Sequence, residues 1–263
     1  MPMSIHRDWI VPDWPAPPQV RALCTTRAGG VSGGPYARLN LGDHVGDDGV
    51  AVARNRELLR EAIGVRPVFL QQVHGVECVE FDTFARHGVD AHDGVPDGRC
   101  ADACTTMAPG LACTVLVADC LPVLLCDRTG RRVAAAHAGW RGLMGGVIET
   151  AARAFGRPAC ELLAWLGPCI GPRAFEVGAQ VRALLTAADE GAAACFMPAS
   201  TPGKYWADLP ALARRRLHAL GIEAIYGNDG SDDWCTVRQS ARFFSHRRDR
   251  ISGRFAALVW IDA

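Results

Sequence analysis

The sequence has no excess of charge of either sign and no long apolar run. Lys and Arg together number 28, as do Asp and Glu, so the formal net charge is zero. A neutral chain lacks an overall attraction to phosphate backbones or anionic lipids, so we expect neither nucleic acid nor a membrane as partner. No run approaches the ~20 apolar residues that a membrane-spanning helix requires. The start of the chain carries Asp8, Pro12 and Asp13 without an apolar core, so it does not resemble a signal peptide.

The cysteines include no Cys-x-x-Cys pair, the usual element of a closed structural zinc site. Their number, 11, is odd, and a chain of 263 residues can bury a core without disulfides. We therefore expect reduced thiols and a cytoplasmic location rather than a secreted disulfide scaffold. Most of these thiols are assigned to packing, namely Cys100, Cys104, Cys113, Cys126 and Cys169. His6 and His218 are assigned to the surface.

No internal repeat, low-complexity linker or charge block divides the chain, so we expect a single domain over residues 1–263. The patterns predict helices at 50–63, 143–155, 178–188 and 208–220 and a mobile loop at 86–100. They predict strands at 68–72, 111–117, 123–125, 132–136, 161–166, 222–226 and 254–260. Helices and strands alternate irregularly. An α/β (α+β mixed) fold, a layered sandwich of mixed β-sheet and helices, fits this order better than a doubly wound parallel sheet.

A β-hairpin is predicted over 114–137. Asp127 and Gly130 occupy the first and fourth positions of a type I turn between its two arms. A hairpin centred on this turn places Cys120 directly opposite His137, with Cβ atoms ~5 Å apart. A bulge at Pro122 would shift the register by one residue and send the two side chains to opposite faces, so this pairing stays conditional.

Cys120 and His137 could bind one zinc ion if a third ligand joined them. His74, which follows the predicted strand 68–72, is the best candidate. Two imidazoles and one thiolate leave a fourth position open, as in catalytic zinc sites. The alternative remains that Cys120 is a small buried hydrophobe and that the histidines are core residues with hydrogen-bond partners.

Three segments in order, 71–75 (QQVHG), 118–123 (ADCLPV) and 135–142 (AAHAGWRG), resemble the YfiH/YlmD family, also called the laccase-domain or polyphenol-oxidase family. Further matches are 26–32 and 40–42 near the start and 167–172 and 244–249 near the end, so the resemblance covers nearly the whole chain. His246 and Phe175 stand where tyrosine is common in the family, which affects local contacts.

The resemblance implies that the family's zinc ligands fall on His74, Cys120 and His137. It implies a layered α/β sandwich related to bacterial toxin cysteine hydrolases. It also implies purine nucleoside phosphorylase activity on adenosine, inosine, guanosine and methylthioadenosine, with adenosine deaminase activity beside it. Copper-linked phenol oxidation and the exclusion of wrong amino acids from peptidoglycan precursors are attached to the family as well.

Phosphorolysis requires groups that bind a phosphate dianion, and guanidinium groups are well suited to this. Arg27, within the glycine-rich segment 25–34, is our first choice, and with His74, Cys120 and His137 it forms the predicted catalytic set. Other substrate or phosphate contacts are predicted for Asn40, Arg141 and Arg247. The alternatives are ordinary turns for the glycines, since the segment lacks the Gly-Lys-Ser/Thr of a P-loop, and surface salt bridges for the arginines.

Other activities compete with this one. Multicopper oxidation of phenols requires several coppers and a large set of histidines. The chain has only eight histidines, and some of them are assigned to the surface, so this activity is not favoured. Copper could still enter the predicted zinc site, because it binds such ligands tightly. A hydrolase that edits peptidoglycan precursors could use Cys120 as nucleophile and His137 as base. In a strand, Asp119 would face away from Cys120. A binding module without catalysis is the third possibility, and the oligomeric state is left open.

Overall fold

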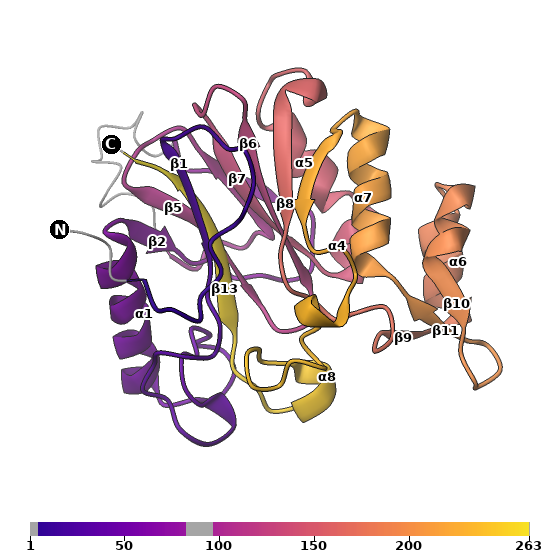
Figure 1. Ribbon diagram of the computed structural model, residues 1–263, viewed down its shortest axis with the longest axis horizontal. Helices are drawn as coiled ribbons and strands as arrows, with labels where there is room; N and C mark the ends of the chain where they lie inside the picture. Colours follow the sequence, from indigo (N-terminus) through magenta and orange to yellow (C-terminus); the bar gives the residue numbers. More distant parts are fainter. Residues whose placement is uncertain (1–4, 83–96, 263) are drawn as a thin grey trace.

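Four layers stack on one another in the computed structural model, which describes residues 5–82 and 97–262 (Figure 1). The first layer is helix α1 (Gly49–Ile63), the second a four-stranded sheet and the third a six-stranded sheet. The fourth consists of the helices α4 (Trp140–Gly145), α5 (Val147–Arg153) and α7 (Leu209–Leu220). No helix in the described ranges combines the length and apolar character needed to cross a bilayer.

The four-stranded sheet lies between α1 and the larger sheet. Its strands in spatial order are β1 (Val20–Cys24), β13 (Phe255–Ile261), β5 (Leu111–Val117) and β2 (Arg66–Val68). Only β2 and β5 run parallel; the other neighbours are antiparallel. Phe255 and Ala257 pack between the two sheets, whereas Leu258 packs in the cluster that contains residues of α1. Burial on both faces explains why this strand reads as a continuous apolar run.

The six-stranded sheet forms the centre of the molecule. In spatial order its strands are β12 (Ala224–Gly227), β8 (Leu162–Leu166), β6 (Leu121–Asp127), β7 (Val133–Ala138), β4 (Ala103–Thr106) and β3 (Cys78–Glu80). The pairs β12–β8 and β3–β4 are parallel and the others antiparallel, so the predicted mixed sheet is confirmed. One face packs on the smaller sheet and the other on α4, α5 and α7.

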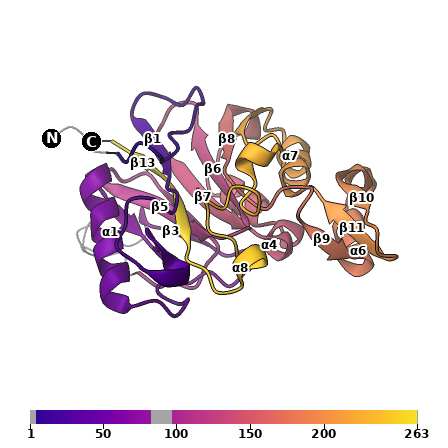
Figure 2. The same cartoon turned by 60° about the horizontal axis from the view of Figure 1, so that its bottom comes forward.

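A small antiparallel sheet projects from one end of the molecule (Figures 1 and 2). It contains β10 (Phe196–Pro198), β11 (Lys204–Ala207) and β9 (Glu176–Gly178), with α6 (Ala179–Thr186) beside it. The remaining short helices are η1 (Gly34–Tyr36), η2 (Ala159–Glu161), η3 (Glu190–Cys195), η4 (Asp232–Trp234) and α8 (His246–Asp249).

The predicted helices are confirmed with one exception. Asp48 caps α1, and Gly64 ends it with a left-handed φ of 73°. The predicted helix 143–155 is wrong at its start and is not continuous. It begins at Trp140 and is interrupted at Gly146, whose φ of 98° cannot continue a helix.

The predicted strand 68–72 is also wrong in its bounds, because β2 ends at Val68 and only Gln71 forms an isolated bridge, with Cys100. Most of the loop predicted at 86–100 lies outside the described residues.

The predicted hairpin is correct at its turn and wrong in its first arm and register. Gly130 N donates to Asp127 O at 3.0 Å, as the type I turn requires. However, β5 belongs to the other sheet, so the hairpin contains only β6 and β7. Pro122, not Cys120, lies opposite His137. The reason is that Asp127 N donates to Arg132 O at 3.3 Å, so Asp127 pairs with Arg132 and the loop between the arms consists of residues 128–131. Cys120 therefore lies two residues beyond the partner of His137, a displacement that preserves the face.

Candidate metal site and its cavity

Three segments from different layers bring His74, Cys120 and His137 together. His74 lies in the loop after β2, Cys120 in the link that carries the chain from β5 to β6, and His137 in β7. One ligand atom of each lies within 4.8 Å of those of the other two. In residues 5–82 and 97–262 this is the one such group of three or more His, Cys, Asp or Glu side chains.

Asp102, a buried carboxylate, fixes two of the three ligand segments. Its oxygens accept hydrogen bonds from the backbone N–H groups of three successive loop residues, Val73 at 3.0 Å, His74 at 2.9 Å and Gly75 at 2.6 Å. Its Oδ1 also lies 2.8 Å from Nδ1 of His137. Because His74 adopts a left-handed φ of 60°, its conformation depends on such support.

The donor set fits a single metal ion. The contact with Asp102 occupies Nδ1 of His137 and leaves Nε2 for a metal, an arrangement common among metal-binding histidines. Nε2 of His74 lies 3.7 Å from Sγ of Cys120. Zinc, with bonds of ~2.0 Å to nitrogen and ~2.3 Å to sulfur, can be reached by all three atoms after small side-chain movements. Such an ion would have a fourth coordination position free for another ligand.

The protonation of the group is strongly coupled. Burial raises the pKa of Cys120. The positive charge of His137 and hydrogen bonds from both histidines outweigh this effect and lower the pKa to about 6. Burial lowers the pKa of His137, whereas the charge of Cys120 and the contact with Asp102 raise it to about 9. Burial also opposes ionisation of Asp102, yet its hydrogen bonds, first that with His137, lower its pKa overall. The thiolate is the form of Cys120 that binds a cation, whereas His137 must release its Nε2 proton when a metal binds.

Close packing leaves no room for a side chain at Gly139. A methyl group there would lie 2.8 Å from Sγ of Cys120 and 3.0 Å from Cδ2 of His74. Asp119, before Cys120, adopts a φ of 96° and is not in a strand, so the expectation that it faces away from the site is wrong. Its carboxylate accepts from Thr236 Oγ1 and from the backbone of Arg247, each at 2.6 Å.

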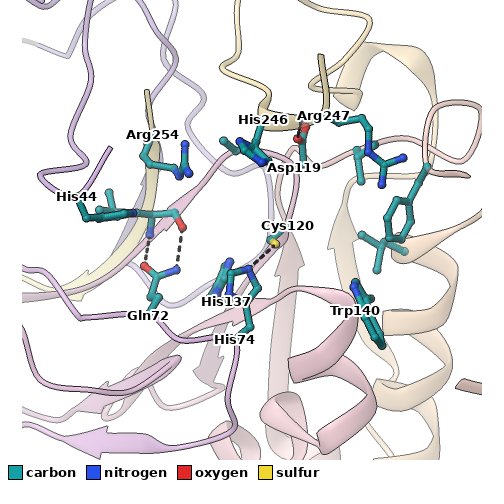
Figure 3. A pocket seen from close by; sticks show the side chains of 15 residues that line it. His44, Gln72, His74, Asp119, Cys120, His137, Trp140, His246, Arg247 and Arg254 are labelled. Carbon is teal, nitrogen blue, oxygen red and sulfur yellow. Dashed lines mark hydrogen bonds between the residues drawn. The ribbon is translucent and has the colours of Figure 1, made fainter. Parts of the chain in front are cut away.

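The three ligand candidates form the floor of a cavity of about 350 Å³. Figure 3 shows Arg254, His44 and Gln72 on one side of Cys120 and Trp140 on the other. Asp119, His246 and Arg247 also line it, and the remaining lining residues are apolar, namely Leu116, Ala118, Ile170, Phe175 and Leu209. The cavity is of a size typical of small-molecule sites.

The other predicted contacts separate into those that line this cavity and those that do not. Arg247 lines it. Arg27 does not; its guanidinium donates to Ala37 O at 2.7 Å and Ser240 O at 2.9 Å. Asn40 is buried behind the lining, where its Oδ1 accepts from the backbone of Arg254 at 2.8 Å. Arg141 stacks on the ring of Trp140, 4.4 Å from its centroid, outside the lining.

Sequence reasoning missed Asp102, Arg254, His44 and Gln72. Gln72 exchanges two hydrogen bonds with the backbone of Leu116 and so ties the His74 loop to β5. No local pattern around Asp102 or Arg254 distinguishes them from other acidic and basic residues. Of the cysteines assigned to packing, Cys104, Cys113, Cys126 and Cys169 are buried, but Cys100 is exposed.

Comparison with known proteins identifies the family and agrees with the fold. A family model described as multi-copper polyphenol oxidoreductase laccase matches residues 21–262. The chain belongs to this family. A member from Pseudomonas aeruginosa, named purine nucleoside phosphorylase, is 51% identical over 97% of the chain and 98% of its own length. The purine nucleoside phosphorylase YfiH of Escherichia coli is 46% identical over 96% of the chain and 98% of its own length.

Solved structures show the same architecture. The crystal structure of a Neisseria meningitidis protein superposes with a TM-score of 0.89, is 44% identical and covers 98% of the chain and 100% of its own. The predicted membership of the YfiH family and the layered α/β fold are therefore confirmed.

Proposed function

We propose that this chain is a zinc-dependent purine nucleoside phosphorylase in which His74, Cys120 and His137 hold the metal. The observation that carries the proposal is the open three-ligand group on the floor of a 350 Å³ cavity. Two relatives named purine nucleoside phosphorylase support it, because they are 51% and 46% identical to this chain over nearly the whole length of both proteins. Two nitrogens and one thiolate with a free fourth position are typical of catalytic zinc, although copper could occupy the same donors.

Phosphorolysis of adenosine, inosine, guanosine or methylthioadenosine is the proposed reaction. The bond between N9 and C1′ breaks with its electron pair on the purine, a phosphate oxygen bonds to C1′, and the proton of hydrogen phosphate passes to the base. A bound metal would supply Lewis-acid chemistry in the cavity floor. The aromatic ring of Trp140 and the apolar Phe175 and Leu209 offer a surface for the purine.

Deamination of adenosine is proposed as a second reaction in the same cavity. Water adds to C6 of the purine and ammonia leaves, so phosphate is not consumed. Both reactions need the nucleoside in one cavity, and phosphate and water therefore compete for the space beside it.

A hydrolase is the second candidate, and one observation favours it. Asp102 orients His137 through the 2.8 Å contact at Nδ1, and His137 lies beside Cys120, which is the order of a nucleophile, a base and an orienting carboxylate. Such a triad could act on a peptidoglycan precursor. The presence of His74 beside the thiol favours metal binding instead, since a simple triad does not use a second imidazole.

Multicopper phenol oxidation, which the family description names, is not favoured by the donor groups. The described part of the chain supplies one group of three His and Cys ligands, whereas this chemistry requires several coppers. The cytoplasmic location and the absence of nucleic acid and membrane partners stay predictions.

The test incubates zinc-loaded protein with adenosine over a range of phosphate concentrations and quantifies adenine, ribose 1-phosphate and inosine. We expect adenine and ribose 1-phosphate in equal amounts only with phosphate, and inosine that declines as phosphate rises. Cys120→Ala should lose bound zinc and both activities while its circular dichroism stays native. Cys160→Ala, which removes an exposed thiol outside the cavity lining, is the matched control and should keep zinc and activity.

Absence of ribose 1-phosphate from the wild-type reaction would overturn the phosphorylase proposal. Full zinc in Cys120→Ala would show that the metal lies elsewhere. Inosine formation that stays constant while adenine rises would contradict a shared cavity.

A further inference from the structure

We propose that Arg254, assisted by His44, forms the phosphate subsite, on the side of the cavity opposite Trp140. This proposal rests on the proposed function and specifies where its second substrate binds. It differs from the sequence prediction, which assigned phosphate to Arg27.

Arg254 is held rigidly at the edge of the cavity by its own backbone. Its N–H donates to Asn40 Oδ1 at 2.8 Å, and its C=O accepts from Leu41 N at 3.0 Å. The side-chain stem crosses Gly42, where a methyl group would lie 2.8 Å from Cγ of Arg254. Nη1 donates to Ser252 O at 2.8 Å and to Gly253 O at 3.0 Å. The guanidinium is therefore positioned before any ligand arrives.

The remaining donors of this guanidinium have no protein partner. In the described ranges, Nε and Nη2 of Arg254 donate no hydrogen bond, and no carboxylate lies within ion-pair distance of them. By contrast, Arg56, which lies outside the cavity lining, pairs with Asp43 at 3.1 Å. A half-buried guanidinium without a carboxylate is costly unless an anion binds it. Its planar fork suits two oxygens of a phosphate.

The rest of the lining directs an anion to this side. Asp119 is the one carboxylate among the described lining residues, and both of its oxygens already accept hydrogen bonds. His44 lies beside Arg254 in Figure 3. Its Nδ1 lies 3.4 Å from Oδ1 of Asp43, which leaves Nε2 to donate a hydrogen bond to a phosphate oxygen. Arg247, the other lining arginine, stacks 5.3 Å from the ring of Phe175 and donates to Glu176 O, so it belongs to the apolar side.

The two sides together suit an in-line displacement at C1′. Phosphate must approach C1′ from the side opposite the departing purine. Figure 3 shows Cys120 between Arg254 and Trp140. A purine against Trp140 and a phosphate at Arg254 would therefore place the ribose between them, beside the metal-ligand candidates. Arg27, outside this lining, would bind phosphate away from the ribose.

The experiment measures the phosphate and inosine dependence of phosphorolysis by zinc-loaded wild type, Arg254→Gln and Arg254→Lys. We expect Arg254→Gln to raise the phosphate KM roughly 10- to 100-fold, the loss typical of a charge-assisted contact, with an inosine KM within about twofold of wild type. Arg254→Lys should recover part of this loss, because it restores the charge but not the fork. Zinc content must be equal in all variants.

Arg214→Gln is the matched control. Arg214 is likewise half-buried and donates to backbone carbonyls, including Asn228 O at 2.8 Å, but it lies on α7 outside the cavity lining. It should leave both KM values near those of wild type. An unchanged phosphate KM in Arg254→Gln, or an equal rise in the inosine KM, would overturn the proposal.

Binding of inorganic phosphate by calorimetry, without nucleoside, separates this proposal from the proposed function. If wild type binds phosphate and Arg254→Gln does not, the subsite stands even where no phosphorolysis occurs. If both proteins bind phosphate equally, the subsite is wrong whatever the activity.

Discussion

Asp102 connects, through a single side chain, groups that lie 28 and 35 positions away in the sequence. It accepts from three backbone N–H groups of the His74 loop and holds Nδ1 of His137. Outer partners of this kind set the tautomer and orientation of metal-binding histidines. We infer that Asp102 positions the ligands without touching the metal.

Replacement of Asp102 by Asn should lower zinc affinity about 10- to 100-fold, as is typical for such outer partners. The reason is that Nδ2 of Asn is a donor, and it would face N–H groups that now donate to a carboxylate. Zinc affinity would be measured by competition with a chromophoric chelator.

The matched control is Asp82→Asn. Asp82 also accepts backbone N–H bonds, from Met107 at 2.9 Å and Ala108 at 3.1 Å, but it lies outside the cavity lining. It should lose stability and keep its zinc affinity. An equal loss of affinity in both variants would mean that Asp102 acts only through general stability.

The sequence could predict which residues form the candidate metal site, but not the groups that position them. His74, Cys120 and His137 stand in recognisable motifs, and their ligand atoms do converge. Asp102 and Arg254 act through contacts made only when distant segments meet, so no spacing reveals them. The role predicted for Arg27 has no support from the geometry, because its donors hold the backbone of Ala37 and Ser240.

The β6–β7 hairpin shows how an element can be correctly recognised and still misaligned. Asp127 at its turn accepts three hydrogen bonds on Oδ1, from Thr129 N, Thr129 Oγ1 and Arg131 N at 2.9, 2.7 and 3.1 Å. Burial opposes its ionisation, but these hydrogen bonds and the charge of Arg157 lower its pKa overall. The folded pKa thus lies below the unfolded value, which is about 3.9 for Asp.

This shift makes the hairpin sensitive to acid. A lowered folded pKa contributes stability above the unfolded pKa, and that contribution is lost as the pH falls below about 4 toward the folded pKa. Asp127→Asn keeps an acceptor but no charge, so its unfolding free energy should fall less steeply between pH 7 and pH 3 than that of wild type. Asp127→Ala should lose roughly 2–3 kcal/mol at pH 7, because three donors lose their partner.

Urea unfolding at several pH values measures both effects. Parallel pH curves for wild type and Asp127→Asn would contradict the role assigned to the carboxylate. Loss of stability in Asp127→Ala below about 0.5 kcal/mol would show that water replaces the carboxylate at no cost.

Alternation and turn signals predicted the turn itself, but the register depended on information outside the hairpin. The apolar run at 111–117 reads as a continuation of the same arm, yet β5 pairs with β13 and β2 in the other sheet. The chain leaves one sheet and enters the next at Asp119, whose left-handed conformation no residue-type rule predicts. Cys120 is available as a ligand because it lies in this link and not in a paired strand.

At the scale of the whole molecule, the ligand group joins the two central sheets. His137 belongs to the six-stranded sheet, and Cys120 lies in the link from the four-stranded sheet to it. The His74 loop is tied to β5 through Gln72 and Leu116 and to the six-stranded side through Asp102. The layered arrangement was predictable from the order of elements. Its division into two central sheets was not, because buried strands in either sheet read alike.

A metal held between these layers should stabilise the entire fold. A ligand that binds only the folded state adds stability that grows with its free concentration, about 4 kcal/mol at 1,000 times its Kd. We therefore expect removal of zinc by a chelator to lower the thermal midpoint on the order of 10 °C for a chain of this size. The loss should appear in hydrogen exchange at residues 72–75 and 118–121, because the metal would join these two segments in addition to the contacts of Gln72, Asp102 and Asp119. Cys120→Ser supplies the comparison: its midpoint should resemble that of the metal-free wild type and should not respond to the chelator. Equal midpoints for zinc-loaded and zinc-free wild type, with occupancy confirmed by elemental analysis, would mean that the two sheets pack without help from the metal and that the site serves chemistry alone.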